Sequence, residues 1–295
     1  MKKLFFYAAT VCVILSSCSK SEEPIIEVST KTPINLSISQ ATRANDTTFE
    51  SGDNVGLYVV NYNGATAGTL ATSGNYVDNM KFTYDGSAWT PTSTIYWLDK
   101  TTKADFYAYY PYSTPTDVSA HPFSVQTDQS NEASYWASDF LWGKAEGIPP
   151  TKNAVPITTN HAFSNILIYL VAGEGFTAET FAAATKSVKI NNIKTSATIN
   201  LATGEATATG NTATVIPWKE SDHYRAMIVP QTVTNSVALI TVTINDVEYS
   251  LKKAITFAPN TQHKATIRIN RTSNGVNIGI GGWESDNNDY GGDAE

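Results

Sequence analysis

Cysteine is almost absent from this 295-residue chain, and both copies, Cys12 and Cys18, lie close to its N-terminus. The rest of the chain therefore has no thiol for a disulfide, a thiolate nucleophile or a cysteine-bound metal. Histidine is scarce too, and no two copies stand at a metal-ligand spacing. The four histidines are His121, His161, His223 and His263. Stability must come from packing and main-chain hydrogen bonds, and we expect no metal site.

Charged residues make up only 16% of the chain, and the formal net charge is −7. Such a sparse, acidic chain is unsuited to a phosphate backbone, so we expect no nucleic-acid partner. Hydrophobic residues still reach 41%. The composition is that of a globular protein with a neutral, Thr- and Asn-rich surface, and the length is sufficient for two domains.

Catalytic motifs are also missing. There is no Gly-x-Ser-x-Gly turn and no glycine loop that would hold a phosphate ahead of a helix. Asp46, Glu50 and Asp53 lie near one another in the sequence. Solvated surface carboxylates explain them better than a glycosidase acid pair does. We therefore expect no catalytic residues, no cofactor and no enzymatic activity.

The N-terminus has the pattern of a secretory signal. Lys2 and Lys3 precede an apolar run, residues 4–15, that is too short to span a bilayer well. The run ends in Leu-Ser-Ser-Cys, which resembles the bacterial lipoprotein box. That resemblance implies removal of residues 1–17 and attachment of lipid, including palmitate, to Cys18. The alternative is an ordinary secretory signal with an incidental cysteine.

Short β-patterns separated by Gly, Asn, Asp and Pro fill the rest of the chain. One short helix is expected over residues 178–184, with Thr177 as its N-cap. The predicted strands are 54–61, 80–84, 95–98, 106–110, 139–142, 162–171, 187–193, 197–201, 224–229, 237–244, 247–252 and 264–271. Many short strands with one weak helix indicate an all-β fold of two tandem β-sandwich domains.

A Pro- and Gly-rich stretch, residues 143–156, is the best candidate for a domain linker. We expect an N-terminal β-sandwich over residues 44–155 and a C-terminal β-sandwich over residues 156–295. Residues 18–43 precede both as a propeptide, beginning with a polar tether.

One pattern occurs near both ends of the chain: three aliphatic residues alternate with small polar ones, as on a strand with one buried face. The front copy has Ile34, Leu36 and Ile38, and the back copy has Val276, Ile278 and Ile280. The two triads match in spacing and size. A strand at one end could therefore replace the strand at the other, because added strands bind through the backbone and through alternate side chains.

Arg43 lies between the front copy and the rest of the chain, in a segment without a strand pattern. The other three arginines, Arg225, Arg268 and Arg271, fall in or at the ends of predicted strands. An arginine-specific protease would thus have one easy target, and a cut between Arg43 and Ala44 would free the front strand.

Several segments together resemble the fimbrillin family of Bacteroidia, the FimA/Mfa-like subunits of type V pili. In chain order the segments are Thr42-Arg43-Ala44, Phe49–Tyr58, Tyr109–Tyr112, Ser138–Gly143, His161–Ile166, Val229–Thr232 and Gly282-Trp283. The resemblance covers nearly the whole chain and implies two transthyretin-like β-sandwich domains without catalysis. The acidic pair Glu22-Glu23 also resembles the surface-export signal of Bacteroidetes lipoproteins.

The family implies an assembly route. The precursor travels as a lipoprotein to the outer membrane and cell surface, held by lipid on Cys18. An arginine-specific protease then removes the strand carrying Ile34, Leu36 and Ile38. A C-terminal strand from a neighbouring pilin subunit, here Val276, Ile278, Ile280 and Trp283, fills the groove. The product is a fimbrium that supports adhesion to a host or bacterial surface ligand.

Two alternatives remain. Gly279, Gly281 and Gly282 weaken the donor strand, and Trp283 has the opposite parity from Ile280 unless a bulge intervenes. A tip or accessory subunit is therefore an alternative to a stem subunit. Separately, the aromatic runs at 96–97, 106–112 and 135–142 could form a glycan-binding platform on a surface lipoprotein that does not polymerise, or they could fill the sandwich cores.

Overall fold

The computed structural model describes residues 31–40, 49–272, 275–285, 288–289 and 292–293, with side chains described up to Asn270. Strands dominate these ranges, which contain two short helices, α1 (Glu132–Trp136) and α2 (Ala178–Ala183). The expected all-β class is confirmed. Within the described ranges, no helix has the length and apolar character needed to cross a membrane.

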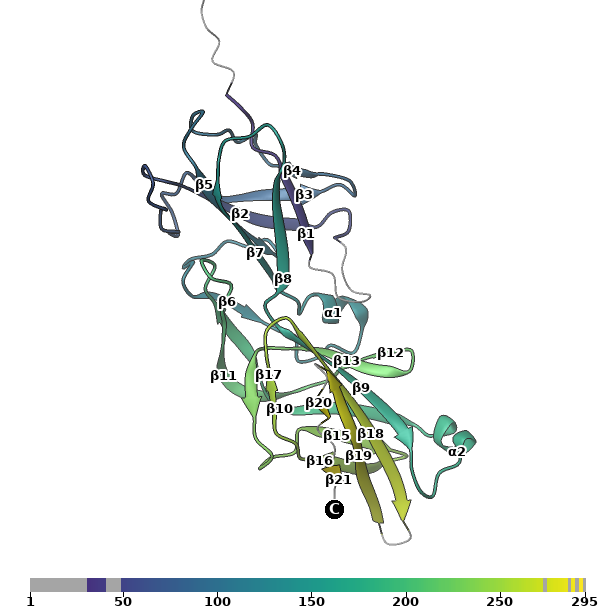
Figure 1. Ribbon diagram of the computed structural model, residues 1–295. Coiled ribbons are helices and arrows are strands. Elements are labelled where there is room, and N and C mark those ends of the chain that lie inside the picture. The colour runs from purple at the N-terminus through teal and green to yellow at the C-terminus, as the bar shows by residue number, and fades with distance from the viewer. Residues whose placement is uncertain (1–30, 41–48, 273–274, 286–287, 290–291, 294–295) are drawn as a thin grey trace, which may run out of the picture. The chain divides into compact units, whose positions relative to one another are not determined.

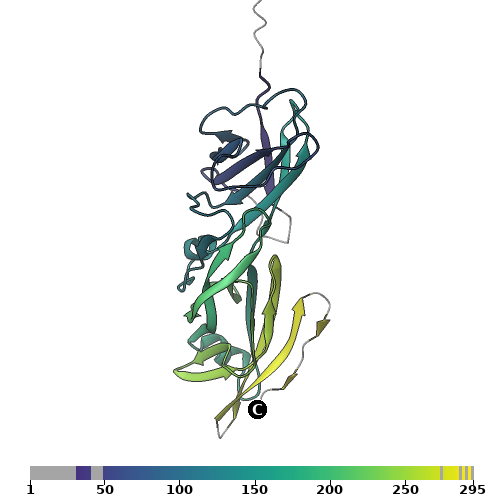
Figure 2. The same cartoon turned by 90° about the vertical axis from the view of Figure 1, so that its left-hand side faces the viewer.

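The first sheet has seven strands in the order β1-β8-β7-β5-β2-β3-β4 (Figure 1). The strands are β1 (Leu36–Gln40), β2 (Asn54–Asn61), β3 (Val77–Tyr84), β4 (Trp89–Pro91), β5 (Ala104–Tyr110), β7 (Leu141–Ile148) and β8 (Val155–His161). β1 runs parallel to β8, while the other neighbours in this sheet are antiparallel. Figures 1 and 2 both show the purple β1 beside the teal β8.

The central strands β2 and β5 are buried on both faces. Leu57 and Val59 of β2 point into a core that also holds the side chains of β1. Tyr58 and Val60 point the other way, into a second core shared with residues of the later sheets. This two-sided burial explains why β2 reads as an almost continuous apolar run.

The later strands form a five-stranded sheet, a second seven-stranded sheet and a two-stranded sheet. The five-stranded sheet has the path β11-β10-β15-β16, and β6 also pairs with β10. The seven-stranded sheet has the path β12-β13-β9-β18-β19-β20, and β21 pairs with β19, while β14 and β17 form the short sheet.

These strands are β6 (His121–Ser124), β9 (Ser164–Ala172), β10 (Lys186–Ile199), β11 (Ala206–Val215), β12 (Trp218–Glu220), β13 (His223–Ile228), β14 (Gln231–Val233), β15 (Ile240–Ile244), β16 (Val247–Leu251), β17 (Ile255–Phe257), β18 (Thr261–Thr272), β19 (Gly275–Ser285), β20 (Asn288–Asp289) and β21 (Gly292–Asp293). A third core lies between the two larger sheets. Ala265, Ile267 and Ile269 of β18 point into it, as their alternation predicts.

The predicted linker at residues 143–156 is wrong. β7 extends to Ile148, and β8 begins at Val155, so residues 143–148 and 155–156 belong to strands of the first sheet and residues 149–154 connect them. The predicted strand at 95–98 reduces to an isolated bridge between Pro33 and Tyr96. β8 lies just beyond the expected start of the second domain, yet it pairs in the first sheet. The two-domain division with a boundary at residue 155 stays a prediction.

The helix over 178–183 is confirmed, with Thr177 as its N-cap in a capping box with Thr180. Helix α1 was not expected. Its N-cap is Asn131, whose side chain accepts a hydrogen bond from the main-chain nitrogen of Ser134. Two predicted strands, 187–193 and 197–201, are one strand, β10, which continues through two register shifts against β11.

Candidate functional site

β1 is an edge strand of the first sheet and lies next to β8. The register pairs Leu36 with Val155 and Gln40 with Thr159. β7 pairs with β8 only from Thr159 onward, so residues 155–158 have β1 as their one strand partner among the described residues. Loss of β1 would leave this part of β8 with an open edge.

The opposite side of the β1 segment is held at its beginning by the chain around Tyr96. The main-chain nitrogen of Ile34 donates to the carbonyl of Ile95 at 2.9 Å, and the nitrogen of Trp97 donates to the carbonyl of Thr32, also at 2.9 Å. The segment therefore lies between β8 and residues 95–97, and we call the place that it fills the β1 groove.

The predicted triad fills the floor of this groove. Ile34, Leu36 and Ile38 are 2%, 6% and 7% exposed and belong to the core of the first sheet. The alternate residues Ser37 and Ser39 are exposed. The groove thus takes up every second side chain of the strand and leaves the others in solvent, as the sequence pattern predicts.

Two side chains of the groove contact the main chain of β1. The indole Nε1 of Trp89 donates to the carbonyl of Ile38 at 3.2 Å. The hydroxyl of Thr159 donates to the carbonyl of Ser39 at 3.1 Å. Both side chains belong to buried residues. The sequence analysis assigned no role to Trp89 or Thr159, and Pro156 obscures the alternation of Val155, Ile157 and Thr159.

The proposed lipid and protease sites, Cys18, Arg43 and Ala44, lie outside the described residues. The described chain resumes at Phe49, whose ring packs edge-on against Trp89 at 4.9 Å and against Tyr110 at 5.8 Å. Ile38 and Phe49, on either side of this stretch, therefore both contact the core of the first sheet.

The proposed donor residues Val276, Ile278, Ile280 and Trp283 lie in β19, of which only the backbone is described. β19 pairs antiparallel with β18, with Ile278 opposite Ile269 and Ile280 opposite Ile267. A register shift then places Trp283 opposite Ala265. This bulge restores Trp283 to the parity of the triad, as the sequence requires for a common face. The structure does not bring these residues to the β1 groove.

The other three arginines all lie in paired strands. Arg225 is buried in β13, between β12 and β9. Arg268 and Arg271 lie in β18, where the register pairs them with Gly279 and Val276 of β19. A protease needs an extended, unpaired chain, so these three positions are poor substrates in the folded protein.

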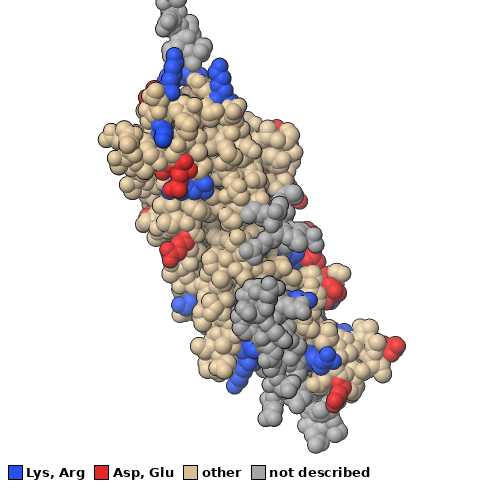
Figure 3. All heavy atoms as spheres, viewed as in Figure 1, with Lys and Arg blue, Asp and Glu red and all other residues tan. Residues whose placement is uncertain are grey.

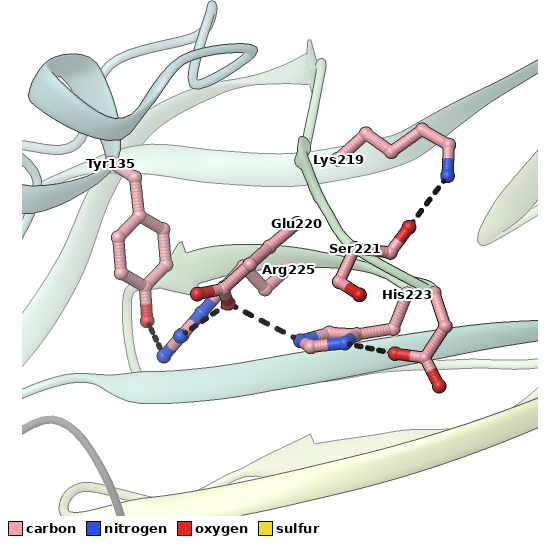
Figure 4. Close-up of polar contacts among 7 residues, drawn as sticks. Tyr135, Lys219, Glu220, Ser221, His223 and Arg225 are labelled. Carbon is pink, nitrogen blue, oxygen red and sulfur yellow. Dashed lines mark hydrogen bonds and ion pairs between the residues drawn. The ribbon is translucent and has the colours of Figure 1, made fainter.

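A group of polar contacts surrounds Arg225 (Figure 4). Its guanidinium donates to the Tyr135 hydroxyl at 2.6 Å and to a carboxylate oxygen of Glu220 at 2.8 Å. It also lies 4.4 Å from the centroid of the Tyr135 ring. His223 approaches the same Glu220 carboxylate at 3.4 Å. These contacts join α1 to the β12–β13 hairpin, so a role in holding these elements together explains them.

Ser113 and His121 form a Ser–His contact. The Ser113 hydroxyl lies 3.1 Å from Nε2 of His121, a residue that is 5% exposed. Burial lowers the pKa of His121. Its Nδ1 has no hydrogen-bond partner among the described residues, so no third group orients the ring as a catalytic triad requires. In the described ranges no cluster of His, Cys, Asp or Glu could hold a metal ion.

The aromatic runs fill cores. Phe106, Tyr107, Tyr109, Tyr135 and Phe140 are each at most 4% exposed. Among the described residues, Tyr96 is the one exposed aromatic side chain, at 40%. The described part of the chain therefore has no group of aromatic rings that are all classed as exposed. The surface in Figure 3 is mostly uncharged, with isolated basic and acidic residues, which agrees with the low charge content.

Comparisons with known proteins add an independent finding. The family model described as fimbrillin-like matches residues 42–283. A Bacteroides uniformis protein with the provisional name fimbrium subunit Fim1C is 28% identical over 309 residues, covering 97% of this chain and 96% of its own length. A Bacteroides ovatus protein, provisionally named fimbrium tip subunit Fim1C, is 30% identical over 157 residues, covering 45% of this chain and 28% of its own.

Solved structures share the fold. A provisionally named cell adhesion protein from Bacteroides ovatus aligns with a TM-score of 0.67 at 16% identity, covering 86% of this chain and 98% of the other. One from Bacteroides uniformis aligns with a TM-score of 0.61 at 23% identity, covering 85% and 97%. At these identities the likeness supports the fold alone.

Proposed function

The chain belongs to the fimbrillin-like family of fimbrial and adhesion subunits, which are not enzymes, and on that premise we propose that it polymerises by strand exchange. The proposed precursor is a lipoprotein held in the outer membrane through Cys18. An arginine-specific protease cuts it between Arg43 and Ala44, and β1 then leaves. Other pilin subunits are its partners, and the cell surface and fimbrium are its location.

One observation carries the proposal. β1 and the residues just before it supply three buried side chains to the core of the first sheet, yet this segment connects to the residues that follow it only through the stretch that contains Arg43. The strand is thus a separable piece of the core. The other arginines lie in paired strands, so a cut at Arg43 would separate the strand without opening the fold elsewhere.

The energetics favour replacement over an empty groove. Burying three aliphatic side chains contributes about 1.5–3 kcal/mol each, or roughly 5–9 kcal/mol in all. Loss of β1 would expose that surface and would also leave unpaired the main-chain groups of residues 155–158 and 95–97. A cut subunit with an open groove would therefore bind another strand of similar pattern.

The strand around Val276, Ile278 and Ile280 has the matching pattern. As a donor it would have to exchange its ladder with β18 for a ladder in the neighbour's groove. The new ladder and the three aliphatic residues in the groove would offset the bonds that are lost. The bulge at Ala265–Thr266 supports a four-residue face that includes Trp283.

The name of the Bacteroides ovatus relative makes a tip position a second candidate for the same subunit.

The test replaces single arginines. We expect Arg43→Ala to remain an uncut, monomeric lipoprotein on the cell surface. Arg268→Ala is the matched control, because it removes an exposed arginine from a paired strand; it should assemble as the wild type does. Assembly is measured by electron microscopy and by the ladder of polymers on gels. Fimbriae of normal length in Arg43→Ala would refute cleavage-dependent assembly.

A further inference from the structure

β1 has a complete main-chain partner on one side only. β8 pairs with it from Leu36 to Gln40. On the other side, main-chain bonds reach Thr32 and Ile34, and among the described residues none continues beyond Ile34. Residues 36–40 therefore have no β-ladder on that side among the described residues, and other contacts hold them there.

On the side away from β8, the Trp89 indole takes this role and donates to the carbonyl of Ile38. On the β8 side, the hydroxyl of Thr159, a residue of β8, donates to the next carbonyl, that of Ser39. Thr159 is 1% exposed and Trp89 is 8% exposed. Two buried donors from the body of the protein thus bind two successive carbonyls at the end of the strand that lies closest to the proposed cut.

We propose that Trp89 and Thr159 hold the main chain of whichever strand occupies this groove. Every residue carries a carbonyl oxygen, so these two contacts do not depend on the side chains of the strand. They would pass unchanged from β1 to a replacement strand. With the two triads aligned, the carbonyls of Ile280 and Gly281 would take the places of those of Ile38 and Ser39.

The position of Trp89 is set by residues that would stay with the body after the cut. Its ring contacts Phe49 at 4.9 Å and Tyr84 at 5.1 Å. The indole N–H would therefore remain aimed at the groove when β1 leaves. A buried donor without an acceptor is unfavourable, so the open groove would favour a new backbone over water at this point.

This inference rests on the proposed strand exchange, and the experiment separates the two. The full chain is cut in place after Arg43, and release of the N-terminal fragment is followed by size-exclusion chromatography and mass spectrometry. Excess synthetic peptide is present, with the sequence of residues 31–40 in one arm and 275–283 in the other. Trp89→Phe and Thr159→Val each remove one donor and keep most of the side-chain shape.

Each variant should release the fragment, and also each bound peptide, roughly 2- to 10-fold faster than the wild type. The fold-change should be the same for both peptides, because only the main chain is bound. Trp142→Phe is the matched control, since the Trp142 indole donates to the carbonyl of Leu201 and its ring packs against another core. Thr158→Val is the control on the exposed face of β8. Both controls should release at the wild-type rate.

Exchange that proceeds at the wild-type rate in both Trp89→Phe and Thr159→Val overturns this inference and leaves the proposed function intact. An effect confined to the 31–40 peptide also overturns it, because the contact would then depend on side chains. A wild-type protein that keeps its fragment and accepts neither peptide overturns strand exchange itself, and this inference with it.

Discussion

The substitution Leu36→Ala tests whether β1 is a structural part of the first core. Leu36 is 6% exposed and lies in the same apolar cluster as Phe106 and Ile157. Leu→Ala changes at such positions cost about 2–5 kcal/mol, because packing contacts are lost and a cavity remains. We expect a loss of about 3 kcal/mol in the free energy of unfolding of the first sheet.

The measurement is urea unfolding of the uncut chain, with Ser37→Ala as the matched control. Ser37 is the exposed neighbour on the same strand, so its substitution should change the free energy by less than about 0.5 kcal/mol. After a cut at Arg43, a loss of about 3 kcal/mol should also speed release of the fragment by roughly a hundredfold, at tenfold per 1.4 kcal/mol.

The reasoning would be refuted if Leu36→Ala and Ser37→Ala unfolded at the same urea concentration. That result would mean that the buried face of β1 contributes nothing to the first core. Equal fragment release from the two cut variants would lead to the same conclusion by a kinetic route.

Two further predictions concern the rest of the fold. Gly204 has φ +77°, and an added Cβ would lie 2.4 Å from the Trp142 ring. Gly204→Ala should therefore have a free energy of unfolding in urea about 1–3 kcal/mol lower than that of Gly64→Ala, because Gly64 has φ +62° but open space around it. Equal free energies of unfolding would contradict the close contact between Gly204 and Trp142. Burial lowers the pKa of His121, so the unfolded chain takes up the proton first as pH falls below about 6.5, and stability is lost from there downward. Urea unfolding between about pH 7 and 5 should show a smaller loss in His121→Gln than in the wild type, and equal losses would argue against a buried neutral imidazole.

Local pattern was sufficient to predict several elements. β2 matches the predicted range of 54–61 because an apolar run is bounded by Asn at both ends. The helix at 178–183 was predicted from its cap, since Thr177 and Thr180 form the reciprocal bonds that begin a helix. The alternation of buried and more exposed residues in β18 was predicted because apolar and polar residues alternate along its sequence, as on a strand with one solvent-exposed face.

Other elements depend on partners that are distant in sequence. β8 was missed because Pro156 and nearby glycines have the composition of a linker, yet β1 pairs with it from more than a hundred residues away. β11 has mainly Ala and Thr, without a large apolar alternation, and forms as the ladder partner of β10. In both cases tertiary pairing overrides a weak local signal.

The candidate site shows the same division. The burial of Ile34, Leu36 and Ile38 could be predicted from their spacing, and it is confirmed. The contact from Trp89 to the carbonyl of Ile38 could not, because the two residues are 51 positions apart and the acceptor is main chain. The parity of Trp283 was resolved by a bulge whose position depends on the register with β18.

The most direct test of the central claim is N-terminal sequencing of this protein taken from assembled fimbriae on the cell surface. Cleavage and loss of β1 predict a mature chain that begins at Ala44. A chain blocked by lipid at Cys18 and still carrying Ile34, Leu36 and Ile38 would contradict removal of the strand, and with it the strand-exchange account.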